Sequence, residues 1–339
     1  MDRRLPIVAM ALSLTSCSND PPMAESGPKP TVELVGTWTL GSSPGREARF
    51  SRDGKLLAAS TASGDIVIRR SSDWKVVRRL SHPNGATGLD FNADSSLLFT
   101  TGYDGWVRSW DVRSGLERWR QHLSRQPFWT IDVSPDGRWL ALAGEDKAIR
   151  LVPLGLPKPR LRVLRGHNRN IWEVRFSPDS ERFASGSFDR TARLWNLNRA
   201  GSKLLLGHGQ AVVGLAFDPR GKWLATGGDD STIRLWDARN GTAARIIPAG
   251  NHVYKLDFSP DGRWLVAGGR ARGAIGTFWY QLTNSGRAAT PLRFWRVEDG
   301  VQVAALPHPT DVFAASFSPD GRYLATADDH GALRVWAVR

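Results

Sequence analysis

A pattern of apolar and polar positions recurs seven times along the chain. Each copy has an apolar anchor, a turn resembling Ser-Pro-Asp-Gly, a short apolar run, a second turn and a segment resembling Arg-Leu-Trp. The seven anchors are Phe50, Phe91, Val133, Phe176, Phe217, Phe258 and Phe317. Successive anchors are 41, 42, 43, 41, 41 and 59 residues apart. This spacing predicts a chain of repeated structural units, of which the sixth is longer than the others.

Within one repeat, short apolar runs bounded by turn residues predict β-strands. In the fourth repeat, the runs 174–176, 182–185 and 191–195 predict three successive strands. The Asp-Gly and Pro-Asp pairs between the runs of the repeats supply hairpin turns, where glycine tolerates a positive φ. A period of about 40–45 residues with four short strands is the signature of a β-propeller blade. The chain is therefore predicted to be an all-β protein with seven blades.

The repeat resembles that of the WD40 family over roughly residues 31–339. The resemblance implies four antiparallel strands per blade, named a to d from the axis outwards. It also implies a structural hydrogen-bond network of His, Ser or Thr, Asp and Trp in each blade. Three repeats have all four residues: His82, Thr100, Asp104 and Trp110 in the second; His167, Ser185, Asp189 and Trp195 in the fourth; and His208, Thr226, Asp230 and Trp236 in the fifth.

The two ends of the repeat array are predicted to pair with each other. The chain stops at Arg339, directly after strand c of the seventh repeat, so that blade lacks an outer strand. Residues 32–40 form an apolar strand without a partner in the first repeat. Pairing the two segments would close the ring and remove exposed strand edges, which promote aggregation.

The N-terminus has the features of an export signal. Arg3 and Arg4 precede an apolar run at 5–14 that is too short to span a membrane as a helix. The next residues, Leu-Thr-Ser-Cys, end at Cys17 and resemble the lipobox of bacterial lipoproteins. The resemblance implies cleavage before Cys17 and acylation of its thiol. An ordinary secretory signal is the alternative.

These features predict three parts of the chain. Residues 1–16 are the signal peptide, residues 17–30 are a disordered tether with four prolines, and residues 31–339 are the propeller. Lipid anchoring implies a location in the bacterial cell envelope. Because Ser18 rather than Asp follows the cysteine, the resemblance implies the outer membrane of a Gram-negative host, with the propeller facing the periplasm.

The chain is strongly basic, with 46 Lys and Arg against 33 Asp and Glu and a net charge of +13. The basic residues are spread over the repeats without a compact tract. Two interpretations stay open: a solvated basic rim, or a face that adheres to an anionic envelope polymer or lipid. Nucleic acid is not expected as a partner.

The sequence contains no recognisable motif for catalysis or for a cofactor. Its seven histidines fall about one per repeat, whereas a zinc or catalytic site needs clustered partners. A Gly-rich phosphate loop, a Cys pair and a Gly-x-Ser-x-Gly elbow are all absent from it. We therefore expect no cofactor, no metal, no carboxylate cluster in the channel and no enzymatic activity. An enzyme that uses the channel is the less favoured alternative.

Large aromatic residues are predicted to gather on the face where the d–a and b–c loops emerge. Some stand just before strand a and others precede the network Asp: Trp129, Trp172, Tyr254 and Phe313, and then Tyr103 and Phe188. Exposed aromatic clusters commonly anchor protein interfaces. Stacking of these side chains between the blades is the alternative.

The sixth repeat has an insertion between Gly269 and Leu292. Its aromatic run and a following Asn-Ser-Gly predict a hairpin on the same face, with Arg270, Arg272, Phe278, Trp279, Tyr280 and Arg287 as candidate contacts. Insertions in repeat proteins often lie on the binding face, although a loop that only covers apolar surface is the alternative. The sequence thus predicts a monomeric, non-catalytic scaffold for a protein or peptide whose identity it does not reveal.

Overall fold

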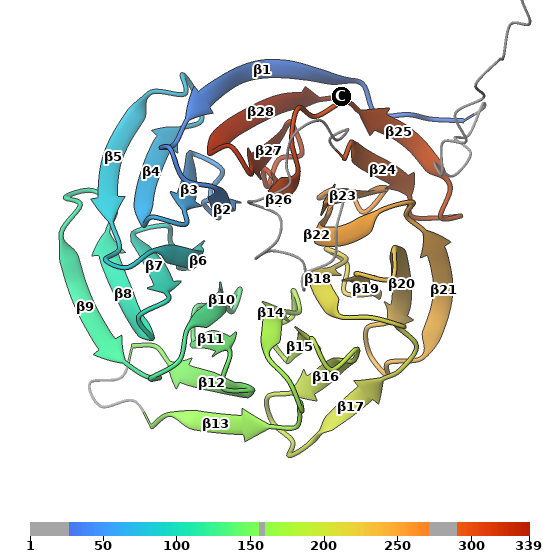
Figure 1. Ribbon diagram of the computed structural model, residues 1–339, viewed down its shortest axis with the longest axis horizontal. Coiled ribbons are helices and arrows are strands. Elements are labelled where there is room, and N and C mark those ends of the chain that lie inside the picture. Colours follow the sequence, from blue (N-terminus) through green and yellow to red (C-terminus); the bar gives the residue numbers. More distant parts are fainter. Residues whose placement is uncertain (1–26, 156–159, 271–289) are drawn as a thin grey trace, which may run out of the picture.

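The computed structural model describes residues 27–155, 160–270 and 290–339. Throughout these residues the regular elements are β-strands, and they form seven four-stranded antiparallel sheets. Figure 1 shows the sheets arranged as blades around a central axis. The predicted all-β, seven-bladed fold is confirmed.

Blades 1 to 6 each use four consecutive strands, in the order a, b, c, d from the axis outwards. Their bounds are β2 (Gly45–Phe50), β3 (Leu56–Thr61), β4 (Asp65–Arg70) and β5 (Val76–Ser81) in blade 1; β6 (Ala86–Phe91), β7 (Leu97–Gly102), β8 (Trp106–Asp111) and β9 (Glu117–His122) in blade 2; β10 (Phe128–Val133), β11 (Trp139–Gly144), β12 (Ala148–Pro153) and β13 (Arg162–Arg165) in blade 3; β14 (Ile171–Phe176), β15 (Arg182–Ser187), β16 (Ala192–Asn196) and β17 (Ser202–Leu205) in blade 4; β18 (Val212–Phe217), β19 (Trp223–Gly228), β20 (Thr232–Asp237) and β21 (Ala243–Pro248) in blade 5; and β22 (His252–Phe258), β23 (Trp264–Arg270), β24 (Leu292–Arg296) and β25 (Gln302–Leu306) in blade 6.

Blade 7 combines strands from both ends of the chain. Its inner strands are β26 (Val312–Phe317), β27 (Tyr323–Asp328) and β28 (Ala332–Val338), and its outer strand is β1 (Val32–Thr39). The β1 strand runs antiparallel to β28, with Val32 opposite Val338 and Thr39 opposite Ala332. The predicted closure of the ring by the N-terminal strand is confirmed.

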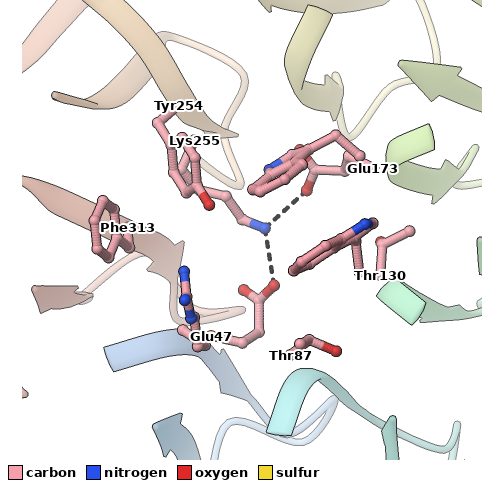
Figure 2. Close-up of a pocket in the computed structure, with 10 residues that line it drawn as sticks. Glu47, Thr87, Thr130, Glu173, Tyr254, Lys255 and Phe313 are labelled. Carbon is pink, nitrogen blue, oxygen red and sulfur yellow. Dashed lines mark hydrogen bonds and ion pairs between the residues drawn. The ribbon is translucent and has the colours of Figure 1, made fainter. Parts of the chain in front are cut away.

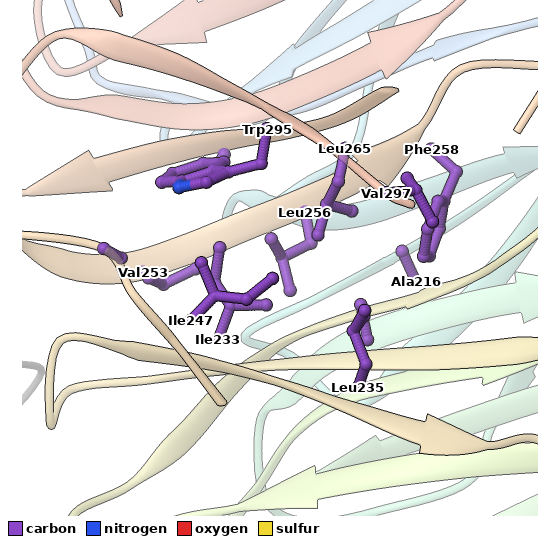
Figure 3. Packing of buried hydrophobic residues seen from close by; sticks show 13 residues of the cluster. Ala216, Ile233, Leu235, Ile247, Val253, Leu256, Phe258, Leu265, Trp295 and Val297 are labelled. Atoms are coloured by element: carbon purple, nitrogen blue, oxygen red, sulfur yellow. The ribbon is translucent and has the colours of Figure 1, made fainter. Parts of the chain in front are cut away.

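The hydrophobic core lies between neighbouring blades. Because side chains alternate along each strand, every sheet presents one apolar face to the blade on either side. Between blades 5 and 6, for example, Ile233 and Leu235 pack against Leu256, Leu265 and Trp295 (Figure 3). The core is therefore a series of layers around the ring, and it leaves the axis free for other residues.

Every strand a has a register shift near its start, at the third residue in β22 and at the second residue in the other six. A β-bulge leaves one residue unpaired and redirects its side chain. The seven bulged residues are Arg46, Thr87, Trp129, Trp172, Val213, Tyr254 and Phe313. The aromatic residues expected just before strand a thus lie inside it, because the bulge adds a residue that the repeat pattern does not reveal.

The His, Ser or Thr, Asp and Trp residues of blade 4 form a connected hydrogen-bond network. His167 lies 2.8 Å from Asp189 through Nδ1 and 2.7 Å from Ser185 Oγ through Nε2. Trp195 Nε1 donates to the same Ser185 hydroxyl at 2.8 Å. Burial alone would raise the pKa of Asp189, but bonds from His167 and Thr191 bring this pKa well below its usual range. These side chains tie strands b and c to the loop before strand a.

The same network is present in blades 5 and 2. In blade 5, His208 bonds Asp230 and Thr226, and Trp236 Nε1 donates to Thr226. In blade 2, the ring nitrogens of the histidine exchange roles: His82 Nδ1 faces Thr100 Oγ1 at 2.9 Å, and Nε2 faces Asp104 at 3.2 Å. Trp110 Nε1 donates to the Thr100 hydroxyl at 2.9 Å, as its counterparts do in the other two blades.

Candidate functional site

The bulged residues converge on one mouth of the central channel. Six of them, together with Glu47, Thr130, Glu173 and Lys255, line a small pocket there of about 30 Å³ (Figure 2). This volume holds about one water molecule. Since the lining residues come from six of the seven blades, the bulges bring residues that are distant in sequence to one place.

The aromatic residues at this mouth form a continuous series of ring contacts. The Trp129 and Trp172 rings are stacked, with centroids 5.1 Å apart and planes inclined by 18°. Trp129 also contacts Tyr103 at 5.5 Å, and Trp172 contacts Phe188 at 5.3 Å and Tyr254 at 5.6 Å. The structure thus brings together the aromatic residues singled out in blades 2, 3, 4 and 6.

The series ends in blade 7 and is flanked by two arginines. Phe313 contacts Tyr254 at 5.1 Å, and both side chains are buried. Arg46 Nη2 donates to the Tyr103 hydroxyl at 2.9 Å, and the Arg270 guanidinium lies 4.6 Å from the Tyr254 ring centroid. Such cation–π contacts hold a positive charge beside the aromatic surface.

Several polar atoms at the mouth are buried without a hydrogen-bond partner in the described part of the chain. They include Trp129 Nε1 and Arg46 Nε, both donors. Leaving a buried donor unpaired costs roughly 1–3 kcal/mol. An incoming acceptor group would remove this cost, so these atoms favour a ligand at the mouth. Arg272, Phe278, Trp279, Tyr280 and Arg287 of the predicted hairpin, and Cys17, lie outside the described residues.

A buried charged layer lies directly below the aromatic mouth. Lys255 Nζ donates to Glu47 and to Glu173, both at 2.8 Å, as Figure 2 shows. Glu173 also accepts the backbone N–H of Leu215 in the next blade at 2.9 Å. Burial alone would lower the pKa of Lys255, but the two glutamates outweigh burial and raise it. The layer therefore joins blades 1, 4, 5 and 6 across the axis.

A second charged layer occupies the residue before the anchor in five blades: Arg49, Asp90, Asp132, Arg175 and Asp257. Each aspartate accepts the backbone N–H of the anchor in the following blade. These acceptor distances are 2.8 Å for Asp90 to Val133, 2.7 Å for Asp132 to Phe176 and 2.7 Å for Asp257 to Phe317. The aspartates therefore link neighbouring blades at the axis.

This layer surrounds a cavity of about 200 Å³ at the other end of the channel, where Arg49, Arg52 and Arg175 face Asp132 and Asp257. Burial, reinforced by the charge of Asp90, raises the pKa of Asp132 to about 8. Burial raises the pKa of Asp257 to about 6. The expectation that the channel lacks a carboxylate cluster is therefore wrong.

The sequence did contain a signal for this cluster. Strand a alternates between core and axis, and its residue before the anchor is charged in five of the seven repeats. In the described ranges, no group of three His, Cys, Asp or Glu side chains is arranged to hold a metal ion. The same residues include no helix with the length and hydropathy needed to cross a membrane. The observed bonds of the axial aspartates are to backbone amides and arginines, which gives them a structural role.

Comparison with known proteins agrees with this architecture. The family model described as "WD domain, G-beta repeat" matches residues 74–111, 116–152, 158–196, 201–237, 245–272 and 300–337. The segments begin at or near the outer strand of one blade, and all but the fifth end in strand c of the next. The fifth match stops at the insertion of blade 6.

A relative covers part of the same repeat array. Protein groucho of Drosophila melanogaster is 28% identical over 167 residues, which are 49% of this chain and 22% of that protein. The chain thus spans less than a quarter of the length of this relative. Because the family model matches well over half of its residues, the chain belongs to the WD40 repeat family.

Proposed function

We propose that this propeller is a non-catalytic scaffold that binds a protein or peptide at the aromatic mouth of its channel. WD40 propellers typically act as protein-interaction scaffolds and generally bind protein partners. The observation that carries the proposal is the unbroken series of ring contacts from Tyr103 to Phe313. Aromatic and arginine side chains are the residues most often found at the energetic centre of protein interfaces.

The chemistry of the mouth suits a partner that supplies an apolar side chain and a hydrogen-bond acceptor. The half-buried faces of Trp129 and Trp172 offer apolar contact area. The unpaired Trp129 Nε1 and the guanidinium of Arg46 offer donors beside it. Because these side chains are held by one another and by the bulged strands, they lose little conformational entropy on binding.

The test compares partner recovery by crosslinking from bacterial envelopes. The variant Trp129→Ala/Trp172→Ala should lower the recovery of a specific partner at least tenfold, which corresponds to about 1.4 kcal/mol. Trp119→Ala makes the same Trp-to-Ala replacement on the rim strand β9 and serves as the control. Equal recovery by the mouth variant and the control would contradict the proposal.

We also propose that the propeller is held at the bacterial envelope by acylation of Cys17. The supporting features are the positive start, the short apolar run and the lipobox-like sequence before that cysteine. Acyl chains anchor an otherwise soluble domain through the apolar area that they bury. Cys17→Ala should abolish incorporation of an alkyne-labelled fatty acid and release the protein from membranes, whereas Ser18→Ala should retain both. Unchanged labelling of Cys17→Ala would contradict lipidation at this residue.

A further inference from the structure

The turn between strands a and b of blade 5 departs from the corresponding turns of the other six blades. Those six turns have an aspartate at their third position: Asp53, Asp94, Asp136, Asp179, Asp261 and Asp320. Blade 5 has Arg220 there. In five of the six turns, the aspartate forms an ion pair with a cation two or three residues further on. In blade 5 the corresponding cation, Lys222, has no such partner in the turn.

The arginine is not required for the turn to fold. In the other turns, the third-position aspartate accepts a backbone N–H, as Asp261 does from Arg263 at 3.0 Å. In blade 5, the first turn residue supplies the acceptor instead: buried Asp218 accepts the N–H of Lys222 at 3.1 Å. The third position is thereby released from its structural role. Arg220 reaches the neighbouring blade, where its Nη2 donates to the Asp261 carbonyl at 2.9 Å.

These residues border a groove of about 470 Å³ between blades 5 and 6, and Pro28 from the segment before β1 also lines it. Its cations are Arg220, Lys222, Arg245, Arg263 and Arg296, against the two acids Asp218 and Glu298. Arg263 and Arg296 are paired with Asp261 and Asp299. In the described part of the chain, Arg220, Lys222 and Arg245 form no ion pair with a carboxylate. The groove therefore carries an unneutralised positive charge.

Two of these cations are held in place by the groove itself. Lys222 Nζ lies 4.8 Å from the Trp223 ring centroid, and Arg245 Nη1 donates to the Val297 carbonyl at 3.0 Å. Apolar lining is present as well, from Trp223, Trp264 and Val297. A partner that fits this surface needs carboxylates for the cations and an apolar side chain for the lining. A phosphate polymer would satisfy only the first requirement.

We propose that the groove between blades 5 and 6 is a second docking site, which binds an acidic and partly apolar peptide segment of a protein partner. Its carboxylates would contact Arg220 and Lys222, and its apolar side chain would lie against Trp223. The volume falls within the range of about 300–1,000 Å³ that is usual for ligand sites. The site lies at the a–b turns, which are at the opposite end of strand a from the aromatic mouth. It therefore goes beyond the proposed function and does not depend on it.

The proposal is tested by fluorescence anisotropy with the purified full chain and a labelled peptide of repeating Glu-Glu-Leu. Arg220→Asp restores the residue of the other six turns and permits an ion pair with Lys222, so it should weaken peptide binding at least tenfold. Arg113→Asp makes the same charge change on an exposed turn residue of blade 2 and should change binding less than about twofold. Lys222→Gln should weaken binding about threefold, with an unchanged melting temperature as the check on folding.

Two further probes separate the proposal from its alternatives. The counterpart peptide of repeating Gln-Gln-Leu should bind at least tenfold more weakly, because it lacks the carboxylates. Arg220→Asp and Arg113→Asp should weaken the binding of polyphosphate to the same extent. Equal losses for Arg220→Asp and Arg113→Asp, or tighter binding of polyphosphate with the same dependence on Arg220, would overturn the proposal. The variant Trp129→Ala/Trp172→Ala should bind the acidic peptide normally, so that failure at one site is distinguishable from failure at the other.

Discussion

Two sets of buried polar side chains in this propeller follow different rules. The network of blade 4 joins His167, Ser185 and Asp189, which all belong to one blade. The axial layer joins Lys255 to Glu47 and Glu173, which are 208 and 82 residues away in the sequence and belong to other blades. The first set is complete in blades 2, 4 and 5, whereas the position of the second set holds Glu in blades 1 and 4, Lys in blade 6 and an uncharged residue in the other four blades. Interactions within a blade are therefore encoded in the repeat, and interactions across the axis are encoded in the departures from it.

The largest expected effect comes from removing the cation of the axial layer. Lys255→Met removes the ammonium that Glu47 and Glu173 share and leaves them only the flanking Arg49 and Arg175. Removing one member of a buried ion pair typically costs about 3–5 kcal/mol. Chemical denaturation should show this loss in the free energy of unfolding. The triple variant Glu47→Gln/Glu173→Gln/Lys255→Met removes all three charges and should recover only part of the loss, because Arg49 and Arg175 then lose their contacts with the two glutamates. A loss below about 1 kcal/mol in Lys255→Met would mean that the ion pairs of Lys255 with Glu47 and Glu173 contribute little to the stability of the fold.

The contributions of the network and of the charged side chains at the axis to the free energy of unfolding should change with pH in opposite directions. Burial, with the charge of Arg108, lowers the pKa of His82 in the network to about 4. Between about 4 and 6.5 the unfolded chain therefore binds more protons, and this contribution to stability is lost as the pH falls through that range. Asp132 at the axis has its pKa raised to about 8, so its contribution is complete at acidic pH and is lost as the pH rises towards and through 8.

Denaturation between pH 4 and 9 with one variant from each set tests this contrast. Asp132→Asn keeps an acceptor for the Phe176 N–H and cannot ionise, so it should reduce the loss of stability on the alkaline side. His82→Gln cannot gain a proton and should reduce the loss on the acidic side. Each unit of pKa shift is worth about 1.4 kcal/mol of pH-dependent stability. Identical pH profiles for Asp132→Asn and the unmodified chain would show that this carboxyl titrates normally.

A smaller effect is expected inside a single blade. Ser185 Oγ accepts the Trp195 indole N–H and bonds His167, so Ser185→Ala removes two hydrogen bonds and leaves buried groups unpaired. The expected loss is about 1–3 kcal/mol in the free energy of unfolding. Ser185→Thr keeps the hydroxyl, as Thr100 and Thr226 do in blades 2 and 5, and should cost less than about 0.5 kcal/mol. Equal losses for the two variants would indicate a packing effect and not the network.

The difference between interactions within a blade and interactions across the axis also explains which features could be predicted from the sequence. The network residues were found because His and Asp recur 22 residues apart in blades 2, 4 and 5. Closure was found because an unpaired strand at one end matched a missing strand at the other. The bulges were missed because an extra residue in strand a leaves no mark on the spacing. The contacts of Lys255 were missed because the residues facing it across the axis depend on the closed ring, which the repeat period does not describe.

The smallest effect is expected from completing the network in blade 7. His330 stands where the network aspartate would be, and His308 Nδ1 instead faces the Thr310 carbonyl at 3.0 Å. His330→Asp would place a carboxylate near the histidine. Because Asp328 already accepts two backbone N–H groups in that turn and carries a negative charge, the gain should stay below about 1 kcal/mol. Thermal unfolding of the variant, with His330→Asn as the neutral control, measures it. A gain in stability as large as the loss in Ser185→Ala would show that the network of each blade stabilises the fold independently of the other blades. A loss of stability would show that the charged residues already present in the blade 7 turn do not tolerate an additional carboxylate.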